Sequence, residues 1–496
     1  MLLSIRPEEM QKLERDWMRG SGVPSALLME HAAMAVCDAL AELVPAGARV
    51  LFLCGPGSNG GDGYAAARIW KRRGGRSVIL SIAAQPSGDA GMNARLAALA
   101  GIPTLSSGQA GDALREADAV CDALFGTGLS RDVTGEVADL IAQVNESGLP
   151  VCAVDIPSGL DGTDGQVRGI AVQAAVTVTF HRPKQGLLIG QSADFTGRIV
   201  TAPILIPEGW SNIPGLRVLL PGDLTSLLKP RRPSCHKGSN GRAVILAGSL
   251  GMAGAAALCA SACIRGGAGL TTILARASIV PILQTLVPGA TCTALPERDG
   301  CLTEEAAGLA ERALASADAA AIGPGLGQGE DLLPLLTVFR RAKCPVVWDA
   351  DALNLLSGHR ELLPLPEKDA VTPHPGEASR LLGQPAATGP HTLRQLRAVT
   401  GCRVLLKGAR TLMSAGAEEA VNITGTPAMA KGGSGDVLTG LLTAVMAQRL
   451  TDDPLTELQL AALLHGMAGL RAEKLCGQRS LTPQELCGCI RAEADA

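Results

Sequence analysis

Two α/β domains, each a three-layer αβα arrangement around a mainly parallel sheet, are the fold that this sequence predicts. The chain has 496 residues, which is too long for one ordinary hydrophobic core. Short β-rich runs alternate with Ala- and Leu-rich helical stretches in both halves of the chain. Many of these runs are apolar on both faces, as strands of a parallel sheet covered by helices must be.

The predicted strands end in loops that are rich in Gly or Asp. In the first half they are "RVLFLCG" (49–55), "ADAVCDALFGTG" (117–128) and "PVCAVDIPSG" (150–159). In the second half they are "RAVILAGS" (242–249), "AAAIGPGLG" (319–327), "CPVVWDADALN" (344–354), "DAVTPHPGE" (369–377) and "CRVLLKGART" (402–411). Helices are predicted between them, for example over residues 93–101 and 303–317. Since ligands bind beyond the carboxyl ends of parallel strands, these loops are predicted to surround the binding sites.

The boundary between the domains is predicted near residues 207–233, where "PEGWSNIPG" and "KPRRPS" concentrate Pro, Gly and polar residues. We place it after residue 215, which gives domains of residues 1–215 and 216–496. No short-period repeat is present, so the two halves can share an architecture without sharing a sequence.

The bulk composition argues against several classes of partner. The chain is 47% hydrophobic with a net charge of -3, and it contains no block of like charges, so nucleic acid is not expected. Aromatic residues make up only 2%, which argues against an aromatic cage. The N-terminus lacks the pattern of a signal peptide, and no uninterrupted apolar run reaches the ~18 residues of a membrane span. We expect a cytoplasmic homo-oligomer with no membrane partner.

The 14 cysteine residues include no Cys-x-x-Cys pair. Cys259 and Cys263 lie four positions apart, and Cys487 and Cys489 lie two apart, without a His at ligand spacing. Zinc is therefore not expected. Reduced cysteines used as small hydrophobic residues in a cytosolic protein explain this usage better.

The segment "GPGSNGGDGYAAARIW" (55–70) places a glycine-rich turn between a predicted strand and a predicted helix. Glycine lets backbone N–H groups approach an anion, and the N-terminus of a helix adds a favourable dipole. The segment matches neither the G-x-G-x-x-G fingerprint nor the phosphate-binding P-loop. Taken alone, it is explained equally well as a tight turn.

Three loops of the first half together offer oxygen ligands. Asn59 lies in the glycine segment, Asp122 begins "DALFGTGLSRD" (122–132), and Ser158 lies in "DIPSGLDG" (155–162). Carboxylate, amide and hydroxyl oxygens would suit an alkali or alkaline-earth cation. The alternative is that each of these residues caps a helix or closes a turn. Their common place at strand ends of one predicted sheet favours the cation.

In the second half, "KGGSGDVLTGLL" (431–442) has the form of an anion hole that leads into a helix. Backbone N–H groups of residues 432–435 could hold a developing phosphoryl charge. Asp436 would lie beside it and could accept a proton from a substrate hydroxyl that attacks phosphorus. The alternative is a helix N-terminal Asp that interacts with the dipole, worth only about 0.3–1 kcal/mol. Three glycines are more than such a cap needs, which favours the catalytic interpretation.

Longer motifs resemble two known families. "GPGSNGGDGYAAAR", "DALFGTGLSR" and "VDIPSGLDG" resemble the NAD(P)H-hydrate epimerase family, whose domain we expect to be Rossmann-like. "HKGSNGRAVILAGSLGMAGAA", "IGPGLG", "DADALN", "TPHPGE", "LKGART" and "GGSGD" resemble the ADP-dependent NAD(P)H-hydrate dehydratase family, which has a ribokinase-like fold. Together they cover nearly the whole chain in the order of the bacterial bifunctional repair enzymes. One departure is Ser58, where the family usually has Asn, and we expect weaker or rearranged anchoring of the ligand there without loss of activity.

The resemblance implies a metabolite-repair function. The substrates are NADH and NADPH hydrated at C6 of the nicotinamide ring, called NAD(P)HX. The N-terminal domain would interconvert the R and S forms, and the C-terminal domain would dehydrate the S form. ADP would be the co-substrate, and the products would be NAD(P)H, AMP and phosphate.

The resemblance also implies roles for single residues of the first half. Asp155 would be the acid or base of epimerisation, and Asn59, Asp122 and Ser158 would hold a potassium ion. The residues that would bind the hydrate are Ser58, Asn59, Gly60, Gly61, Asp62, Gly126, Thr127, Gly128, Leu129, Ser130, Arg131 and Asp132.

In the second half, Asp436 would deprotonate the C6 hydroxyl, and Glu377 would order a magnesium ion with its waters. Ala255, Gly325 and His374 would contact the hydrate together with Asp436. The residues that would bind the nucleotide are Lys407, Gly408, Ala409, Arg410, Thr411 and Gly435.

Two other functions remain open at this stage. A ribokinase-type kinase acting on a hydroxymethyl heterocycle would use the same Gly-Asp segment but would leave a phosphorylated product. The N-terminal domain could instead be a non-enzymatic binding module. Asn59, Asp122 and Asp155 together argue against that module, and nothing makes an epimerase domain useful to such a kinase.

Overall fold

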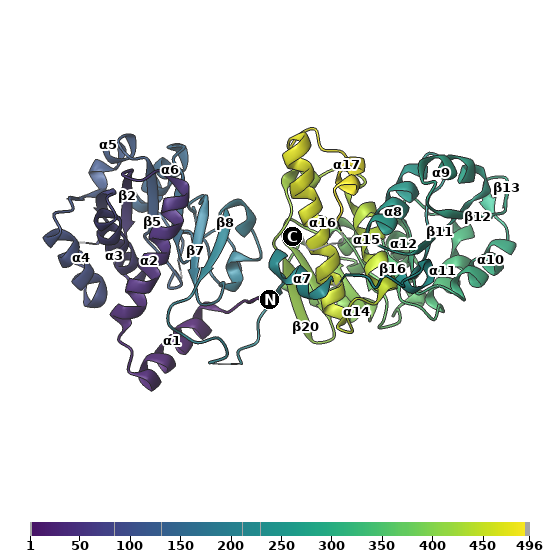
Figure 1. Cartoon of the computed structure of the whole chain (residues 1–496), viewed down its shortest axis with the longest axis horizontal. Helices are drawn as coiled ribbons and strands as arrows, with labels where there is room; N and C mark the ends of the chain where they lie inside the picture. The colour runs from purple at the N-terminus through teal and green to yellow at the C-terminus, as the bar shows by residue number, and fades with distance from the viewer. Residues whose placement is uncertain (1, 84, 130, 211, 229, 492–496) are drawn as a thin grey trace. The chain divides into compact units, whose positions relative to one another are not determined.

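The computed structural model describes residues 2–83, 85–129, 131–210, 212–228 and 230–491. The chain forms two compact units, Leu3–Leu216 and Arg217–Ala496, and Leu2 belongs to the second unit. In each unit, helices pack on a mainly parallel sheet (Figure 1). The strand–helix alternation of the sequence therefore predicted the fold class correctly.

The first unit contains a seven-stranded parallel sheet in the order β4-β3-β2-β5-β6-β7-β8. Its strands are β2 (Arg49–Cys54), β3 (Arg76–Ser81), β4 (Thr104–Leu105), β5 (Ala119–Ala123), β6 (Val151–Val154), β7 (Val176–Phe180) and β8 (Arg198–Ala202). Its helices are α1 (Pro7–Ser21), α2 (Ser25–Leu43), α3 (Ser58–Arg72), α4 (Gly88–Leu99), α5 (Ala110–Arg115) and α6 (Glu136–Glu146).

Both faces of this sheet are buried, which explains why a central strand such as β2 is apolar at nearly every position. Phe52 of β2 belongs to the core that includes residues of α2 and α3. Its neighbour Leu53 belongs to the core on the other face, with residues of α5 and α6. Successive residues of a strand point to opposite faces, so a sheet covered by two helical layers requires apolar residues at every position.

The second unit is built on an eleven-stranded sheet in the order β1-β9-β20-β19-β18-β17-β16-β15-β10-β11-β12. Its strands are β1 (Leu2–Leu3), β9 (Arg217–Val218), β10 (Arg242–Leu246), β11 (Leu270–Arg276), β12 (Thr291–Leu295), β15 (Ala319–Ile322), β16 (Val346–Trp348), β17 (Ala370–Val371), β18 (Arg403–Leu406), β19 (Thr411–Ala415) and β20 (Glu418–Asn422). A separate hairpin pairs β13 (Glu297–Arg298) with β14 (Cys301–Leu302).

The helices of the second unit lie between and after these strands. They are α7 (Leu224–Leu227), α8 (Ala253–Arg265), α9 (Val280–Leu286), α10 (Glu305–Leu314), α11 (Leu333–Arg340), α12 (Asp351–Gly358), α13 (Pro375–Leu382), α14 (Pro390–Thr400), α15 (Ser434–Gln448), α16 (Pro454–Cys476) and α17 (Pro483–Gly488).

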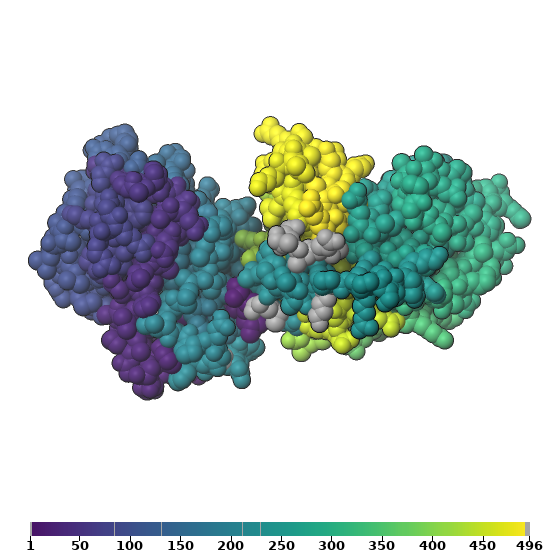
Figure 2. Space-filling view, viewed as in Figure 1, coloured from purple at the N-terminus to yellow at the C-terminus, as the bar shows by residue number. Residues whose placement is uncertain are grey.

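In sheet order, β12, β11, β10, β15, β16, β17 and β18 are parallel. The strand β19 pairs antiparallel with β18, and β20 pairs antiparallel with β19. Ile245 of β10 packs in a core with residues of α8, α15, α16 and α17, while the next residue, Leu246, is buried on the other face. Figure 2 shows the yellow C-terminal segment beside the teal residues that begin this unit, and α8 packs against both α15 and α17. The carboxyl ends of five parallel strands, β10 and β15 to β18, therefore lie along one edge of the sheet.

One local expectation was wrong. Residues 57–63 were predicted to form a glycine-rich turn ahead of the helix, but α3 begins at Ser58, so most of this segment is already helical. A Cβ atom on Gly60 would lie 2.0 Å from the carbonyl oxygen of Gly55, and one on Gly55 would lie 1.7 Å from that of Leu124. These two glycines are therefore required because backbone packs directly on backbone, whether or not an anion binds.

Among the described residues, no helix combines the length and the apolar character that crossing a membrane would need. All fourteen cysteine residues fall in the described ranges as free thiols, and most of them are buried. Within those ranges, no group of three or more His, Cys, Asp or Glu side chains is arranged to hold a metal ion.

Candidate active sites

The first unit contains a cavity of about 530 Å³ at the carboxyl ends of its central strands. It is lined by α1, by the starts of α2, α3 and α4, by the loop that follows β5, and by residues at the carboxyl ends of β6, β7 and β8. The cavity is large enough for a nicotinamide-sized ligand with attached groups. The charged side chains that line it are Glu14, Asp62, Asp89, Arg131, Asp155 and Lys184.

Most of the predicted hydrate-binding residues line this cavity. They are Ser58, Asn59, Asp62, Gly126, Thr127, Gly128, Leu129 and Arg131. Gly60 and Gly61 are buried in the first turn of α3 and do not line it, and Asp132 is exposed and does not line it either. Ser130 lies outside the described residues.

The three residues predicted to hold potassium lie together around Phe125. The Ser158 hydroxyl donates to Oδ1 of Asp122 at 2.6 Å, and the backbone N–H of Ser158 donates to Oδ2 at 2.7 Å. The Asn59 amide donates to the Phe125 carbonyl oxygen at 2.9 Å. Burial raises the pKa of Asp122 to about 6, although hydrogen bonds from Ser158 and Leu124 act to lower it.

This cluster offers a carboxylate, a hydroxyl and a backbone carbonyl, which are the hard oxygen donors that an alkali cation prefers. Rotation of the Asn59 amide about its last bond would add a fourth oxygen to the set. A cation there would favour the charged form of the buried Asp122 carboxylate, which is otherwise disfavoured by its desolvation. The residues present therefore fit an alkali ion.

Asp155 follows β6 and is held by two residues of the β7 region. The Lys184 ammonium donates to Oδ1 of Asp155 at 2.6 Å, and the Thr179 hydroxyl donates to the same oxygen at 3.0 Å. Lys184 is only 1% exposed, and its ammonium also donates to the Phe180 carbonyl oxygen at 3.2 Å. Asp155 has a φ of +64°, a left-handed conformation that costs energy for a residue other than glycine. The strain and the buried cation together fix the direction of this carboxylate.

Asp62 lies on α3 and also lines the cavity, but its surroundings differ. Burial holds the pKa of Asp62 well above its usual range, and the charges of Asp155 and Glu14 raise it further, while Lys184 acts weakly in the other direction. Burial likewise raises the pKa of Glu14. The cavity therefore contains a carboxylate with a close cation and a carboxyl group that favours the protonated form.

In the second unit, the predicted catalytic residue lies at the start of α15. Gly433, with a φ of +99°, turns the chain into the helix, and Asp436 lies in the first turn. The carbonyl oxygen of Ser434 accepts a hydrogen bond from Nε2 of His465 on α16 at 3.0 Å. Burial lowers the pKa of His465 to about 4, so this ring is neutral at neutral pH and Nε2 carries the proton. His465 therefore anchors the turn that presents Asp436.

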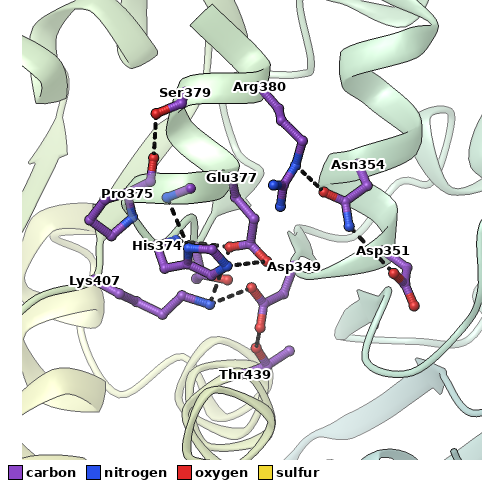
Figure 3. Close-up of polar contacts among 12 residues, drawn as sticks. Asp349, Asp351, Asn354, His374, Pro375, Glu377, Ser379, Arg380, Lys407 and Thr439 are labelled. Carbon is purple, nitrogen blue, oxygen red and sulfur yellow. Dashed lines mark hydrogen bonds and ion pairs between the residues drawn. The ribbon is translucent and has the colours of Figure 1, made fainter. Parts of the chain in front are cut away.

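A network of charged groups lies next to this turn (Figure 3). The Lys407 ammonium donates to Oδ1 of Asp349 at 2.8 Å and lies 3.6 Å from Oε2 of Glu377. The other oxygen of Asp349 accepts a hydrogen bond of 2.6 Å from Thr439, which is one turn after Asp436 on α15. Asp349 is only 1% exposed, and its two hydrogen bonds connect the end of β16 to both Lys407 and α15.

These charges determine the protonation of Asp436. Burial raises the pKa of Asp436 to about 7, and the Asp349 carboxylate adds to that rise, whereas the Lys407 ammonium lowers it. Burial acts to lower the pKa of Lys407, but Asp349 and Glu377 outweigh it, and the pKa is raised. Asp436 is therefore poised to gain and lose a proton near neutral pH, which suits a general base.

The remaining predicted residues of this unit are distributed along the same edge of the sheet. A Cβ atom on Gly435 would lie 3.4 Å from the Lys407 ammonium, so these two predicted nucleotide-binding residues are neighbours. A Cβ atom on Gly325 would lie 2.9 Å from that of Ala255, so the first turn of α8 contacts the loop that follows β15. Gly408 and Ala409 are exposed in the β18–β19 turn, Arg410 donates to the Ile423 carbonyl oxygen at 3.1 Å, and Thr411 donates to that of Gly408 at 3.1 Å.

Glu377 and His374 form the start of α13. Oε2 of Glu377 accepts a hydrogen bond of 2.8 Å from the backbone N–H of His374, and Nδ1 of His374 accepts one of 3.0 Å from Gly376. Glu377 is buried, whereas about half of the His374 side chain is exposed. Glu377 thus caps a helix and lies close to the Lys407 ammonium, and its role toward magnesium stays a prediction.

Sequence reasoning missed several residues of both sites. Lys184 and Glu14 in the first unit, and Asp349, Thr439 and His465 in the second, were given no role. Asp349 lies inside the quoted motif "DADALN", and Lys184 follows β7, whose sequence VTVTF is β-branched and aromatic, by four residues, so a strand-end signal was present for both. Glu14 and His465 lie inside helices and gave no comparable signal.

The fold and the two sites define a class: a two-domain α/β protein with a Rossmann-like unit followed by a ribokinase-like unit. A family model described as NAD(P)H-hydrate dehydratase matches residues 243–491, and one described as YjeF-related protein N-terminus matches residues 25–186. A ribokinase-like superfamily protein from Enterococcus faecalis has a TM-score of 0.50 and 28% identity, covering 55% of this chain and 94% of its own.

Two curated relatives extend the similarity over both units. The bifunctional NAD(P)H-hydrate repair enzyme Nnr of Moorella thermoacetica is 36% identical over 97% of this chain and 94% of that protein. The enzyme of the same name from Vibrio cholerae is 39% identical over 75% of this chain and 74% of that protein. The chain belongs to the family of bifunctional NAD(P)H-hydrate repair enzymes, as its sequence motifs predicted.

Proposed function

We propose that this chain repairs hydrated nicotinamide cofactors, with epimerisation of NAD(P)HX in the first unit and ADP-dependent dehydration of the S form in the second. The observation that carries this proposal is Asp436. It lies in the first turn of a helix that follows a glycine turn, close to the partly buried Lys407, and its pKa is raised to about 7. A base of this kind is needed to activate a hydroxyl for attack on phosphorus.

Dehydration requires a better leaving group than hydroxide. Asp436 takes the proton of the C6 hydroxyl while that oxygen attacks the β-phosphorus of ADP, and the bond between the β-phosphorus and the bridging oxygen breaks to release AMP. The lone pair of the ring nitrogen N1 then expels phosphate from C6, and loss of a proton from C5 restores the double bond of NAD(P)H. The Lys407 ammonium, which lies beside Gly435, would stabilise the charge on the transferred group.

Two ions complete the proposal. A magnesium ion near Glu377 would neutralise the phosphate charges of ADP, and a potassium ion held by Asn59, Asp122 and Ser158 would hold together the loops that carry these residues. In the first unit Asp155 would exchange the proton on which epimerisation depends. The homo-oligomeric state and the cytoplasmic location stay predictions.

The test is to follow the oxygen of the C6 hydroxyl. NADHX labelled there with ¹⁸O is incubated with the protein, magnesium and ADP, and the label is located by mass spectrometry. The expected result is recovery of NADH absorbance, equal amounts of AMP, and ¹⁸O in inorganic phosphate. Label released as water would overturn the phosphoryl route, and a stable phosphorylated product would favour the kinase alternative.

A parallel incubation with ATP tests the co-substrate. ADP is expected to support faster turnover than ATP at matched free magnesium, which follows from family membership and not from a residue that blocks a γ-phosphate. Equal or faster turnover with ATP would contradict this part of the proposal.

A further inference from the structure

Two buried carboxyl groups face the cavity of the first unit from different elements. Asp62 lies in the second turn of α3, and Asp155 lies immediately after β6. Each side chain belongs to a residue that is 9% exposed, and both line the cavity of about 530 Å³. A ligand in this cavity would therefore meet two carboxyl groups that are almost completely removed from bulk water.

The two groups differ in their partners. Asp155 is held in an ion pair of 2.6 Å with Lys184 and accepts a second hydrogen bond from Thr179. Among the residues that the structure describes, none forms a hydrogen bond or an ion pair with the Asp62 side chain. A buried carboxyl group without a cation favours its neutral form, whereas one beside a buried ammonium favours its charged form. The pKa of Asp62, which burial raises well above its usual range, agrees with this difference.

We propose that Asp62 is the general acid of epimerisation, that Asp155 is the matching general base, and that Lys184 is the positioning residue of Asp155. This inference deepens the proposed epimerase function and rests on it. Two carboxyl groups whose environments push their protonation states apart are the arrangement expected of an acid–base pair. Asp62 then has a chemical role and not only the contact role that its motif implied.

The reaction needs one proton donor and one proton acceptor. Asp62 gives its proton to the C6 hydroxyl oxygen as the bond between C6 and oxygen breaks, and water leaves while the N1 lone pair forms a double bond to C6. A water molecule then adds to the opposite face of C6, and its proton passes to Asp155. No oxidant or reductant is consumed. Proton exchange with solvent water then reprotonates Asp62 and deprotonates Asp155 before the next turnover, and the reverse reaction uses the two carboxyl groups in exchanged roles.

Lys184 acts through Asp155 and not on the substrate. Its ammonium is almost fully buried and donates hydrogen bonds to Asp155, to the Phe180 carbonyl oxygen and to the Thr179 hydroxyl, so no N–H group is left for the substrate. Asp155 itself is in a left-handed backbone conformation, so a firm partner is needed to keep the carboxylate directed at the cavity. Loss of the ammonium should therefore leave the Asp155 carboxylate less firmly oriented toward the cavity.

The test measures epimerisation alone, from pure R hydrate without ADP, with chromatographic separation of the two forms. Asp62→Asn should lower kcat by roughly 10²–10⁴-fold while the KM for the hydrate changes little. Asp139→Asn, the same chemical change at an exposed position of α6, is the matched control and should keep the wild-type kcat. Dehydration of S hydrate with ADP shows that each variant is folded.

The pH profile separates the roles. Wild-type kcat/KM should fall at high pH as Asp62 loses its proton, and the other charged groups lining the cavity are Glu14, Asp89, Arg131, Asp155 and Lys184. Lys184→Met should lower kcat while the KM for the hydrate changes little, because the Asp155 carboxylate loses the partner that fixes its direction. A purely structural lysine would lower the amount of folded protein without lowering the kcat of the folded fraction.

Three results would overturn the inference. Asp62→Asn could keep the wild-type kcat; it could raise KM alone, which would make Asp62 a binding residue; or Glu14→Gln could abolish epimerisation while Asp62→Asn does not, which would transfer the acid role to Glu14. If the wild-type protein itself does not interconvert R and S hydrate, the proposed function fails. That outcome is distinct from a failure of Asp62 alone.

Discussion

The two units place the same chemical groups in similar positions but favour different protonation states. Each has a glycine-rich segment at the start of a helix, with a carboxyl group within the first two turns: Asp62 in α3 and Asp436 in α15. Each also has a second carboxylate that is paired with a lysine, Asp155 with the buried Lys184 and Asp349 with the partly buried Lys407. The arrangement therefore recurs on two sheets of different topology.

The two helical carboxyl groups differ in how strongly the nearby lysine lowers their pKa. In the second unit the Lys407 ammonium lowers the pKa of Asp436 appreciably, and the balance with burial leaves it at about 7. In the first unit Lys184 has the smallest effect on Asp62, and burial dominates. The protonation of a carboxyl group at such a helix start thus depends on its burial and on the charges around it, which a motif does not show.

The largest expected effect is loss of dehydration in Asp436→Asn. Removing a general base lowers kcat by roughly 10²–10⁴-fold, because the C6 hydroxyl is no longer deprotonated as it attacks. Epimerisation should be unchanged, since the two sites lie on separate sheets. Chromatography of R and S hydrate with and without ADP measures both. Wild-type dehydration by this variant would remove Asp436 from the comparison.

Asp155→Ala should stop the conversion of R to S hydrate, with a loss of roughly 10²-fold or more because a base is missing. In a repair assay on an R and S mixture, wild type should consume both forms. The variant should consume S hydrate and then stall, apart from slow spontaneous epimerisation. Complete consumption at the wild-type rate would show that the Asp155 loop is structural.

Substitutions of Lys407 and Asp349, the charged neighbours of Asp436, should have smaller effects, which are opposite in direction. Asp436 must be ionised to act as a base, so dehydration should be lost as pH falls through its pKa of about 7. Lys407→Met removes a cation that lowers this pKa, so the acid limb should move up by about one pH unit. Asp349→Asn removes an anion that raises it, so the limb should move down.

Profiles of kcat with pH, at saturating ADP and hydrate, measure these shifts. Saturation matters because Lys407 is also expected to bind the nucleotide, and its variant should have a higher KM for ADP. Shifts in the same direction for both variants would mean that the charges of Lys407 and Asp349 do not act on Asp436 as the structure indicates.

The smallest effect is expected at the cation cluster. Asp122→Ala removes its only carboxylate and should weaken potassium affinity by roughly tenfold or more, as loss of a metal-site residue commonly does. Epimerisation should lose its response to potassium chloride at constant ionic strength, while dehydration should not change. An undiminished potassium response would place the ion elsewhere.

Local sequence patterns determined the fold class and the position of the main functional residues. Continuously apolar runs predicted β2, β5, β6, β10 and β15 to β18, because burial on both faces leaves a direct mark on the sequence. The glycine turn before an apolar run predicted that Asp436 lies in the first turn of a helix. Asn59, Asp122 and Ser158 were predicted to meet because parallel strands end at the same edge.

Only the tertiary structure decided which carboxyl groups receive a partner. Asp155 and Lys184 are 29 residues apart, Asp349 and Lys407 are 58 apart, and Asp349 and Thr439 are 90 apart. The period of an apolar pattern reports how one segment is buried, but a pKa depends on burial and on charges brought from other segments. For the same reason the sequence could not show that Gly55 and Gly60 are required by contact between two backbone segments, or that Asp62 would remain without a cation.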